Sequence, residues 1–185
     1  MRIIDSKIWY IGTKIYDLIT INLLWMIFSI PLITLGPATN AGLKCIEELE
    51  DGSSQNIFLL YLKNFKSNFF SYMLSVNTLL GVLIVFVKLT ISLLYSDNFI
   101  LSGLCMFIGI ECILALGVIF SNDYKNPIDL ILNSIITGNK KALNVLISLI
   151  IYICIFLAVI CIPILLPIAI SSCIFISYKV VYKIY

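Results

Sequence analysis

Long apolar runs constrain the fold of this chain more than any other feature of its sequence. Residues 72–95, 99–120 and 142–178 are almost free of charge, and each reaches the roughly 20 residues that a helix needs to cross a bilayer. Apolar residues make up 61% of the chain and charged residues only 12%. A small soluble domain leaves too much of its chain in water to bury so much apolar surface. The sequence therefore predicts an all-α polytopic membrane protein, because a helix satisfies its own backbone hydrogen bonds within lipid.

We expect one integral membrane domain over residues 1–185, with four to five spans. The apolar spans are predicted at 18–36, 72–95, 99–120, 142–162 and 164–180, and amphipathic helices at 56–71 and 127–137. A single helix over residues 142–178 would measure about 55 Å, against a hydrocarbon core of about 30 Å. Pro163 and Pro167, near the middle of this run, favour two crossings that form a C-terminal helical hairpin. One strongly kinked and tilted helix is the alternative.

A glycine and two prolines interrupt the chain at the end of the first apolar run. Pro31 lies late in that run, and Pro37 suits the first turn of a new helix, where its missing N–H is not needed. The residues that follow are small at first and acidic by Glu50. We predict that the chain turns at Gly36-Pro37 and returns as a short helix.

Basic residues gather near the ends of the predicted spans. The clusters are residues 2–14, 44–66, 125–141 and 179–183. The link at 96–98 contains no basic residue. Cytoplasmic loops are enriched in lysine and arginine, and these clusters share one side only if the chain returns after Gly36-Pro37 and the last run forms a hairpin. We therefore predict a multi-pass protein of the cytoplasmic membrane with a cytoplasmic N-terminus, in which Lys88 alone among the basic residues lies within a span.

The two amphipathic segments carry different signals. In the first, one helical stripe consists of Phe58, Leu62, Phe65 and Phe69. This stripe lies either in the membrane interface or against the protein's own helices. In the second, Asn126 and Pro127 form a typical helix start, and Gly138 is expected to end the helix.

Two ionisable residues lie inside predicted spans. At helical rise, Lys88 lies about 10 Å and Glu111 about 18 Å from the outer surface, on spans joined by a very short link. Ionisable groups within a bilayer are costly and suggest a functional site. An ion pair or a shared polar pocket would form a proton or ion relay, or a contact for a polar ligand. The structural alternative is a pair that only stabilises the helices, or a Lys88 that reaches outward beside a protonated Glu111.

The sequence carries no recognised catalytic, cofactor or metal motif. Histidine is absent, which removes the commonest general base and metal ligand, and no phosphate loop or dinucleotide fingerprint is present. The cysteines lack metal-ligand spacing, and the acidic residues at 47–51 are expected to end a helix in water and not to hold a cation. Asn22 and Asn77 are expected to form interhelical hydrogen bonds. We therefore expect no enzyme activity, no catalytic residue, no cofactor and no metal, and the net charge of +2 gives no sign of nucleic acid binding.

The segment around the first turn is the most distinctive part of the chain. It reads Asn22-Leu23-Leu24-Trp25, then Phe28-Ser29-Ile30-Pro31-Leu32, then Gly36-Pro37-Ala38-Thr39-Asn40-Ala41. This pattern resembles the N-terminal signature of the YesL family, a family of bacterial membrane proteins of unknown function. The signature positions are Asn22, Trp25, Pro31, Gly36 and Pro37, for which we expect structural roles. The likeness continues more loosely over the rest of the chain.

The resemblance implies an origin in Gram-positive bacteria and a role beside carbohydrate uptake. Genes of this family often lie beside genes for sugar-binding ABC transporters, and the family has no established catalytic residue to carry over. We therefore expect a non-enzymatic accessory factor for carbohydrate uptake or its regulation. Its expected partners are the lipid bilayer and ABC-type sugar transporter subunits. The alternative is a small transporter or channel component that uses Glu111 and Lys88.

Overall fold

Every element that the computed structural model describes is a helix. The structure describes residues 2–50, 56–121, 124–161 and 180. In chain order the elements, with η for a 3-10 helix, are α1 (Arg2–Phe28), η1 (Leu32–Thr34), α2 (Leu35–Glu50), α3 (Ile57–Lys66), α4 (Phe69–Tyr95), α5 (Phe99–Val118), η2 (Ile119–Ser121), α6 (Pro127–Lys140) and α7 (Ala142–Cys161). No strand occurs in these ranges, so the predicted all-α class is confirmed.

Two of these helices, α4 and α5, are long and apolar enough to cross a membrane. A third span is reached if α6 and α7, whose axes meet at 89°, form one broken span. These helices fit a membrane protein. The four to five spans predicted from the sequence exceed the two or three found in the described part of the chain. The predicted span at 164–180, and with it the C-terminal hairpin, lies outside the described residues.

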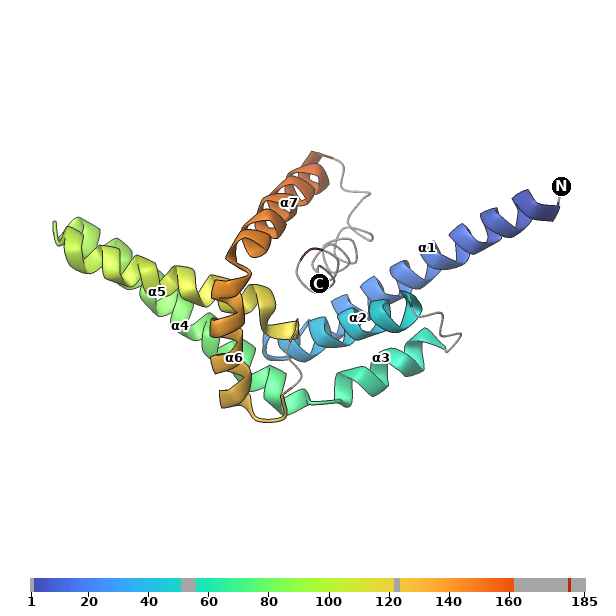
Figure 1. Ribbon diagram of the computed structural model, residues 1–185, viewed down its shortest axis with the longest axis horizontal. Coiled ribbons are helices and arrows are strands. Elements are labelled where there is room, and N and C mark those ends of the chain that lie inside the picture. Colours follow the sequence, from blue (N-terminus) through green and yellow to red (C-terminus); the bar gives the residue numbers. More distant parts are fainter. Residues whose placement is uncertain (1, 51–55, 122–123, 162–179, 181–185) are drawn as a thin grey trace.

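α4 and α5 form a long antiparallel hairpin whose outer half stands clear of the other labelled helices (Figure 1). The link at 96–98 reverses the chain tightly, because the Asn98 N–H donates to the Leu93 carbonyl at 3.1 Å. Asp97, in this link, adopts a left-handed backbone conformation with φ of 56°, which aspartate tolerates better than most residues. The hairpin occupies the apolar runs expected at 72–95 and 99–120.

The first reversal of the chain comes earlier than predicted. α1 ends at Phe28 and α2 already begins at Leu35, so the turn occupies residues 29–34. Gly36 and Pro37, which were expected to form the turn, lie in the first turn of α2. Residues 18–28 therefore complete α1 and do not continue as one helix to residue 36.

Pro31 explains where this turn lies. It has no N–H with which to continue α1, and it disfavours a helical conformation in the residue before it. Thr34 then closes the turn, because its N–H donates to the Pro31 carbonyl at 2.8 Å and its hydroxyl donates to the Phe28 carbonyl at 2.6 Å. The helix restarts at once after these bonds.

α2 runs back along α1, as the charge pattern predicts for a returning helix. Near one end of the pair, Lys14 Nζ donates to the Leu49 carbonyl at 2.7 Å. Near the other end, Trp25 Nε1 donates to Thr39 Oγ1 at 3.1 Å. The two bonds together hold the helices antiparallel.

α3 packs on α1 and α2 through a face that differs from the predicted apolar stripe, of which only Phe65 packs against this core. Its buried residues are Ile57, Leu60, Tyr61 and Asn64. Phe58, the first residue of the predicted stripe, is 49% exposed, and Leu62 and Phe65 are only partly buried. The buried face includes a tyrosine and an asparagine because both find hydrogen-bond partners on α2, which the spacing of apolar residues does not reveal.

The amphipathic helix predicted at 56–71 is split in two by a bend. Asn56 caps the start of α3, where its Oδ1 accepts from the backbone N–H two residues on at 3.0 Å. α3 ends at Lys66, and α4 begins at Phe69. Asn68 between them takes a left-handed conformation with φ of 55°, which redirects the chain.

α6 crosses the base of the α4–α5 hairpin (Figure 1). The Ser75 hydroxyl on α4 donates to the Pro127 carbonyl at 3.0 Å. Gly138 does not end this helix as predicted, since α6 continues to Lys140. A Cβ at this position would lie 2.8 Å from the Leu114 carbonyl oxygen, so the glycine lets α6 approach the α5 backbone closely.

Three apolar cores organise the described residues. The first lies between α1, α2 and α3 and includes Tyr61, the second lies between α4, α5 and α6 and includes Tyr72, and a smaller third one joins Val118 on α5 to Val145 on α7. Phe120 in η2 packs against the first two cores, and its ring stacks on that of Tyr72 with centroids 5.8 Å apart. The two halves of the structure therefore meet near the first turns of α4.

Candidate functional site

The core between α1, α2 and α3 adjoins the core between α4, α5 and α6 where the first turn of α2 touches α4. A Cβ at Gly36 would lie 2.6 Å from the Tyr72 carbonyl oxygen and 3.0 Å from Val76 Cβ. Only glycine fits so close a contact between two helices, as in the small-residue interfaces of membrane helices. Pro37 is buried next to it. We call these four residues the α2–α4 junction.

Side chains from α1 and α3 hold α2 in place beside the junction. The Tyr61 hydroxyl donates to the Ala38 carbonyl at 2.9 Å, and Trp25 donates to Thr39 at 3.1 Å. Tyr61 is fully buried, and burial, with a smaller effect of the nearby Cys45, raises its pKa. The hydroxyl therefore remains a donor at neutral pH. Sequence reasoning missed Tyr61 because a polar tip does not count in an apolar stripe.

Asn64 links α3 to the second half of α2. Its Nδ2 donates to Glu48 Oε1 at 3.1 Å and lies 3.9 Å from Cys45 Sγ. Cys45 is fully buried between these helices. These residues therefore hold α3 against α2.

The two asparagines that we predicted to bridge helices lie in different surroundings. Asn77 Nδ2 donates to the Ile33 carbonyl at 2.8 Å and to the Met73 carbonyl at 2.6 Å, so it ties α4 to η1. The prediction is confirmed for Asn77. Asn22 is fully buried on α1, and its interhelical hydrogen bond stays a prediction.

Asn40 is buried near the junction, and its amide has no hydrogen-bond partner among the described residues. It is 1% exposed and lies one helical turn after Gly36 on α2. An unpaired buried polar group costs about 1–3 kcal/mol. The sequence alone gives no sign that Asn40 is buried.

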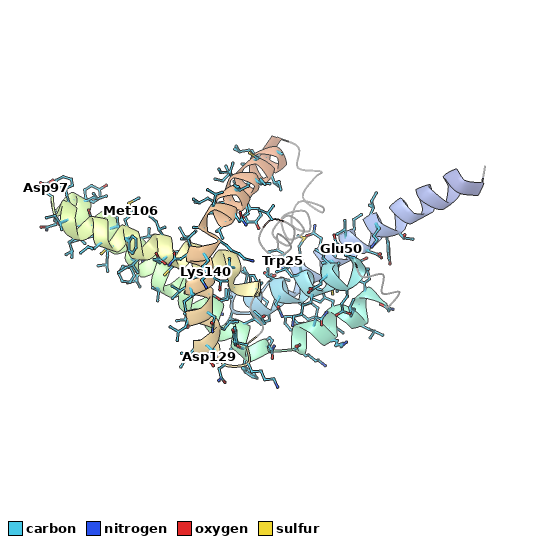
Figure 2. All side chains as sticks on the ribbon, viewed as in Figure 1. Trp25, Glu50, Asp97, Met106, Asp129 and Lys140 are labelled. Carbon is cyan, nitrogen blue, oxygen red and sulfur yellow. The ribbon has the colours of Figure 1, made fainter. Side chains whose placement is uncertain are left out.

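The signature residues of the N-terminal segment take structural positions around α2. Asn22, Gly36 and Pro37 are buried, Trp25 is half-buried, and Pro31 is exposed in the turn. Figure 2 shows Trp25 on α1 at its contact with α2. Their shared effect is to reverse the chain and to seat α2 between α1, α3 and α4.

The structure does not bring Lys88 and Glu111 together. A Cβ at Gly109 would lie 3.8 Å from Leu83 Cδ1, and this register places Lys88 opposite Leu104. Glu111 lies seven residues further along α5, which is about 10 Å at helical rise. Lys88 is exposed, and Glu111 Oε2 is buried with no partner in the described part of the chain. No ion pair joins the two residues there.

The acidic end of α2 does not form a metal site with other described residues. Within residues 2–50, 56–121 and 124–161, no group of three or more His, Cys, Asp or Glu side chains is placed to hold a metal ion. Glu47 is exposed, and Glu48 accepts the hydrogen bond from Asn64. Asp51, the last residue of the acidic run, lies outside the described residues.

The match to a known family falls on the segment that builds the junction. Residues 18–89 match the model of a family described as "Protein of unknown function, DUF624". The match runs from the second half of α1 into α4 and covers less than half of the 185 residues. It supports a domain-of-unknown-function family, and the narrower resemblance to the YesL family stays a prediction. No curated protein and no solved structure matches the chain.

Proposed function

We propose that this protein is a non-enzymatic accessory factor of the cytoplasmic membrane that assists carbohydrate uptake or its regulation. The resemblance of its N-terminal segment to the YesL family supports the link to sugar transport, and the DUF624 match names no activity. The side chains around the junction seat α2 through packing and hydrogen bonds. This supports a protein that works by contact with others and not by catalysis.

The exposed apolar face of α6 carries this proposal. Ile128, Leu132 and Ile136 follow each other at intervals of four residues and are 70%, 55% and 55% exposed. Such spacing places them on one face of the helix, and contiguous exposed apolar surface marks protein or membrane contacts. Phe58 and Leu59 give α3 a second exposed apolar surface. ABC-type sugar transporter subunits are the proposed partners of these two helices.

The proposed topology has a cytoplasmic N-terminus. The antiparallel pair α1–α2 supports it, because Lys14 near the start of α1 contacts Leu49 at the end of α2. A chain that enters and returns in this way keeps the basic residues of its first 14 positions and those of α3 on one side. With this returning segment and a C-terminal hairpin, the chain has four to five spans.

Purification of the tagged full chain from native membranes tests the proposal. We expect ABC-type sugar transporter subunits to co-purify with the wild type. The double substitution Leu132→Gln with Ile136→Gln should remove most of this recovery at unchanged thermal stability, because both side chains are exposed. Lys140→Gln, at an exposed position on the same helix, is the matched control. Recovery of no transporter subunit with the wild type would refute the proposal.

The alternative, a small transporter or channel that uses Glu111 and Lys88, has less support. The two side chains lie about 10 Å apart along the hairpin, so they do not form one polar path. Flux measured with the purified protein in liposomes separates the two functions. A solute flux that Glu111→Gln abolishes would favour the transporter.

A further inference from the structure

The turn between α1 and α2, residues 29–34, exposes apolar side chains. Ile30, Leu32 and Ile33 are each more than half exposed. The adjoining end of α1 adds two more exposed side chains, those of Leu23 and Ile27. Contiguous exposed apolar surface marks contact with lipid or with protein. We call residues 29–34 the α1–α2 turn.

The absence of charge continues from this turn along both helices. Residues 18–43 contain no charged residue, so Asp17 is the last charge before the turn and Lys44 the first charge after it. The bond between Trp25 and Thr39 aligns the two helices. At helical rise, Asp17 lies about 12 Å and Lys44 about 8 Å from this bond, both on the side away from the turn. The pair of helices therefore has one apolar end, at the turn, and one charged end.

Contact with α4 places the turn at membrane depth. Asn77 Nδ2 on α4 donates to the Ile33 carbonyl at 2.8 Å, and Figure 1 shows the start of α2 beside α4. Asn77 lies about 12 Å along α4 from its first residue, Phe69. When a helix of about 40 Å spans a hydrocarbon core of about 30 Å, at most about 10 Å of its base lies outside the core. Asn77 is therefore inside the core wherever along α4 the core lies.

Several carbonyls of the turn have hydrogen-bond donors within the protein. The carbonyls in or next to the turn that accept such bonds are those of Phe28, Pro31, Leu32 and Ile33, and the donors belong to Thr34, Leu35 and Asn77. Irregular backbone at membrane depth needs partners of this kind, because hydrocarbon offers no donor to an exposed carbonyl. The apolar side chains of the turn can thus face lipid while the protein satisfies these carbonyls.

We propose that the α1–α2 turn lies in the hydrocarbon core of the bilayer, where Ile30, Leu32 and Ile33 contact lipid acyl chains. The charge-free part of α1, from residue 18 to Phe28, measures about 16 Å, which is about half the thickness of the core. α1 and α2 therefore form a re-entrant hairpin that enters and leaves on one side without crossing. This inference goes beyond the proposed accessory function, because lipid and not a transporter subunit covers the turn.

The charged end of this re-entrant hairpin lies on the side of the α4 base. Asn64 on α3 donates to Glu48, near the end of α2, at 3.1 Å. α3 ends at Lys66, and α4 begins close after it at Phe69. The polar end of α2 is thus joined through α3 to the base of α4. Because Asn77 lies at most about 12 Å from this edge of the core, the re-entrant hairpin reaches it without passing the bilayer centre.

Quenching by labelled lipids measures the depth of the turn. The full chain, with a single cysteine in a background without native cysteines, carries a small fluorescent maleimide in phosphatidylcholine vesicles. A fraction of the lipid carries a nitroxide, either on the acyl chain or on the headgroup. We expect the acyl-chain nitroxide to quench the label at Leu32→Cys more strongly than the headgroup nitroxide does. Ile30→Cys should repeat this result.

Glu47→Cys is the matched control, because Glu47 is exposed at the charged end of the same hairpin. From Leu35 to Glu47, α2 measures about 18 Å, so a label at residue 47 should lie closer to the headgroups. We expect the order of the two nitroxides to reverse there. In cells, a membrane-impermeant maleimide should label Leu32→Cys only after the protein is denatured, and not after permeabilisation alone.

Three results would overturn the inference. Labelling of Leu32→Cys in intact cells would mean that the segment crosses the membrane, which would also contradict the returning segment of the proposed topology. Labelling after permeabilisation alone, or stronger quenching from the headgroup, would place the turn outside the core. Weak quenching by both nitroxides without labelling would mean that protein covers the turn. The last two results leave the proposed accessory function standing, since co-purification of transporter subunits tests that function separately.

Discussion

The contact between α2 and α4 depends on the absence of a side chain at Gly36. Gly36→Ala adds a Cβ 2.6 Å from the Tyr72 carbonyl oxygen, and we expect the crowding to cost about 1–3 kcal/mol of stability. Thermal unfolding in detergent micelles measures this as a lower Tm. Gly103→Ala is the control, because no atom lies within 4 Å of a Cβ there and alanine favours a helix by about 1 kcal/mol. Equal shifts in Tm for the two variants would contradict the close contact.

Tyr61 makes stability depend on pH only in the alkaline range. Burial raises its folded-state pKa above the ordinary value of 10.0. Below pH 10 both states keep the proton, whereas above it the unfolded state loses the proton first, so stability falls as the pH rises through the folded-state pKa. We therefore expect the wild-type Tm to fall more steeply above about pH 10 than the Tm of Tyr61→Phe.

The matched control for this experiment is Tyr16→Phe, because the Tyr16 side chain is 69% exposed. Its Tm should follow the wild-type curve at every pH. A Tyr61→Phe curve that runs parallel to the wild-type curve would mean that the hydroxyl is not held protonated between α3 and α2.

At the scale of elements, the hydrogen bond between Trp25 and Thr39 allows the α1–α2 contact to be measured on its own. We expect a coupling energy of about 0.5–1.5 kcal/mol between Trp25→Phe and Thr39→Val in a double-mutant cycle of thermal stability. Thr20→Val replaces Thr39→Val in the control cycle, because the Thr20 hydroxyl donates to the Tyr16 carbonyl within α1. Coupling in the first cycle no larger than in the control would show that the bond does not hold the two helices together.

The structure differs from the sequence-based prediction in those elements whose position depends on contacts between residues far apart in the chain. α4 and α5 coincide with long apolar runs, because about 20 consecutive apolar residues leave few alternatives to a spanning helix. The face of α3 depends on Tyr61 reaching Ala38, and the length of α6 depends on Gly138 fitting against Leu114. Such contacts leave no periodic signal in the sequence, so spacing alone did not reveal which face of α3 is buried, and it placed the end of α6 too early.

The candidate polar site formed by Lys88 and Glu111 could likewise be predicted only in part from the sequence. The short link at 96–98 correctly indicates that the helices carrying Lys88 and Glu111 are neighbours. The link does not reveal the register of the two helices, or the helix faces on which Lys88 and Glu111 lie. The contact of Gly109 with Leu83 sets the register of the two helices. Lys88 lies on the face of α4 that points away from α5. The two ionisable residues therefore separate into an exposed cation and a carboxylate with one buried oxygen.

For the whole molecule, the hairpin dimensions predict which segments share a side of the membrane. α4 spans 27 residues, or about 40 Å, which exceeds a hydrocarbon core of about 30 Å. Its tip at Asp97 and its base must therefore lie on opposite sides. At the base, the Ser71 hydroxyl donates to the Tyr124 carbonyl at 3.0 Å, so the start of α4 and the approach to α6 lie together.

Single cysteines in a background without native cysteines test this arrangement in intact cells. We expect a membrane-impermeant maleimide to label Asp97→Cys directly, and to label Lys63→Cys and Lys125→Cys only after the membrane is permeabilised. Both lysines are exposed, so access of the reagent and not burial decides the result. Labelling of residue 63 or 125 in intact cells would place the base of the hairpin outside. The positive-inside pattern would then have to be explained without the returning helix α2.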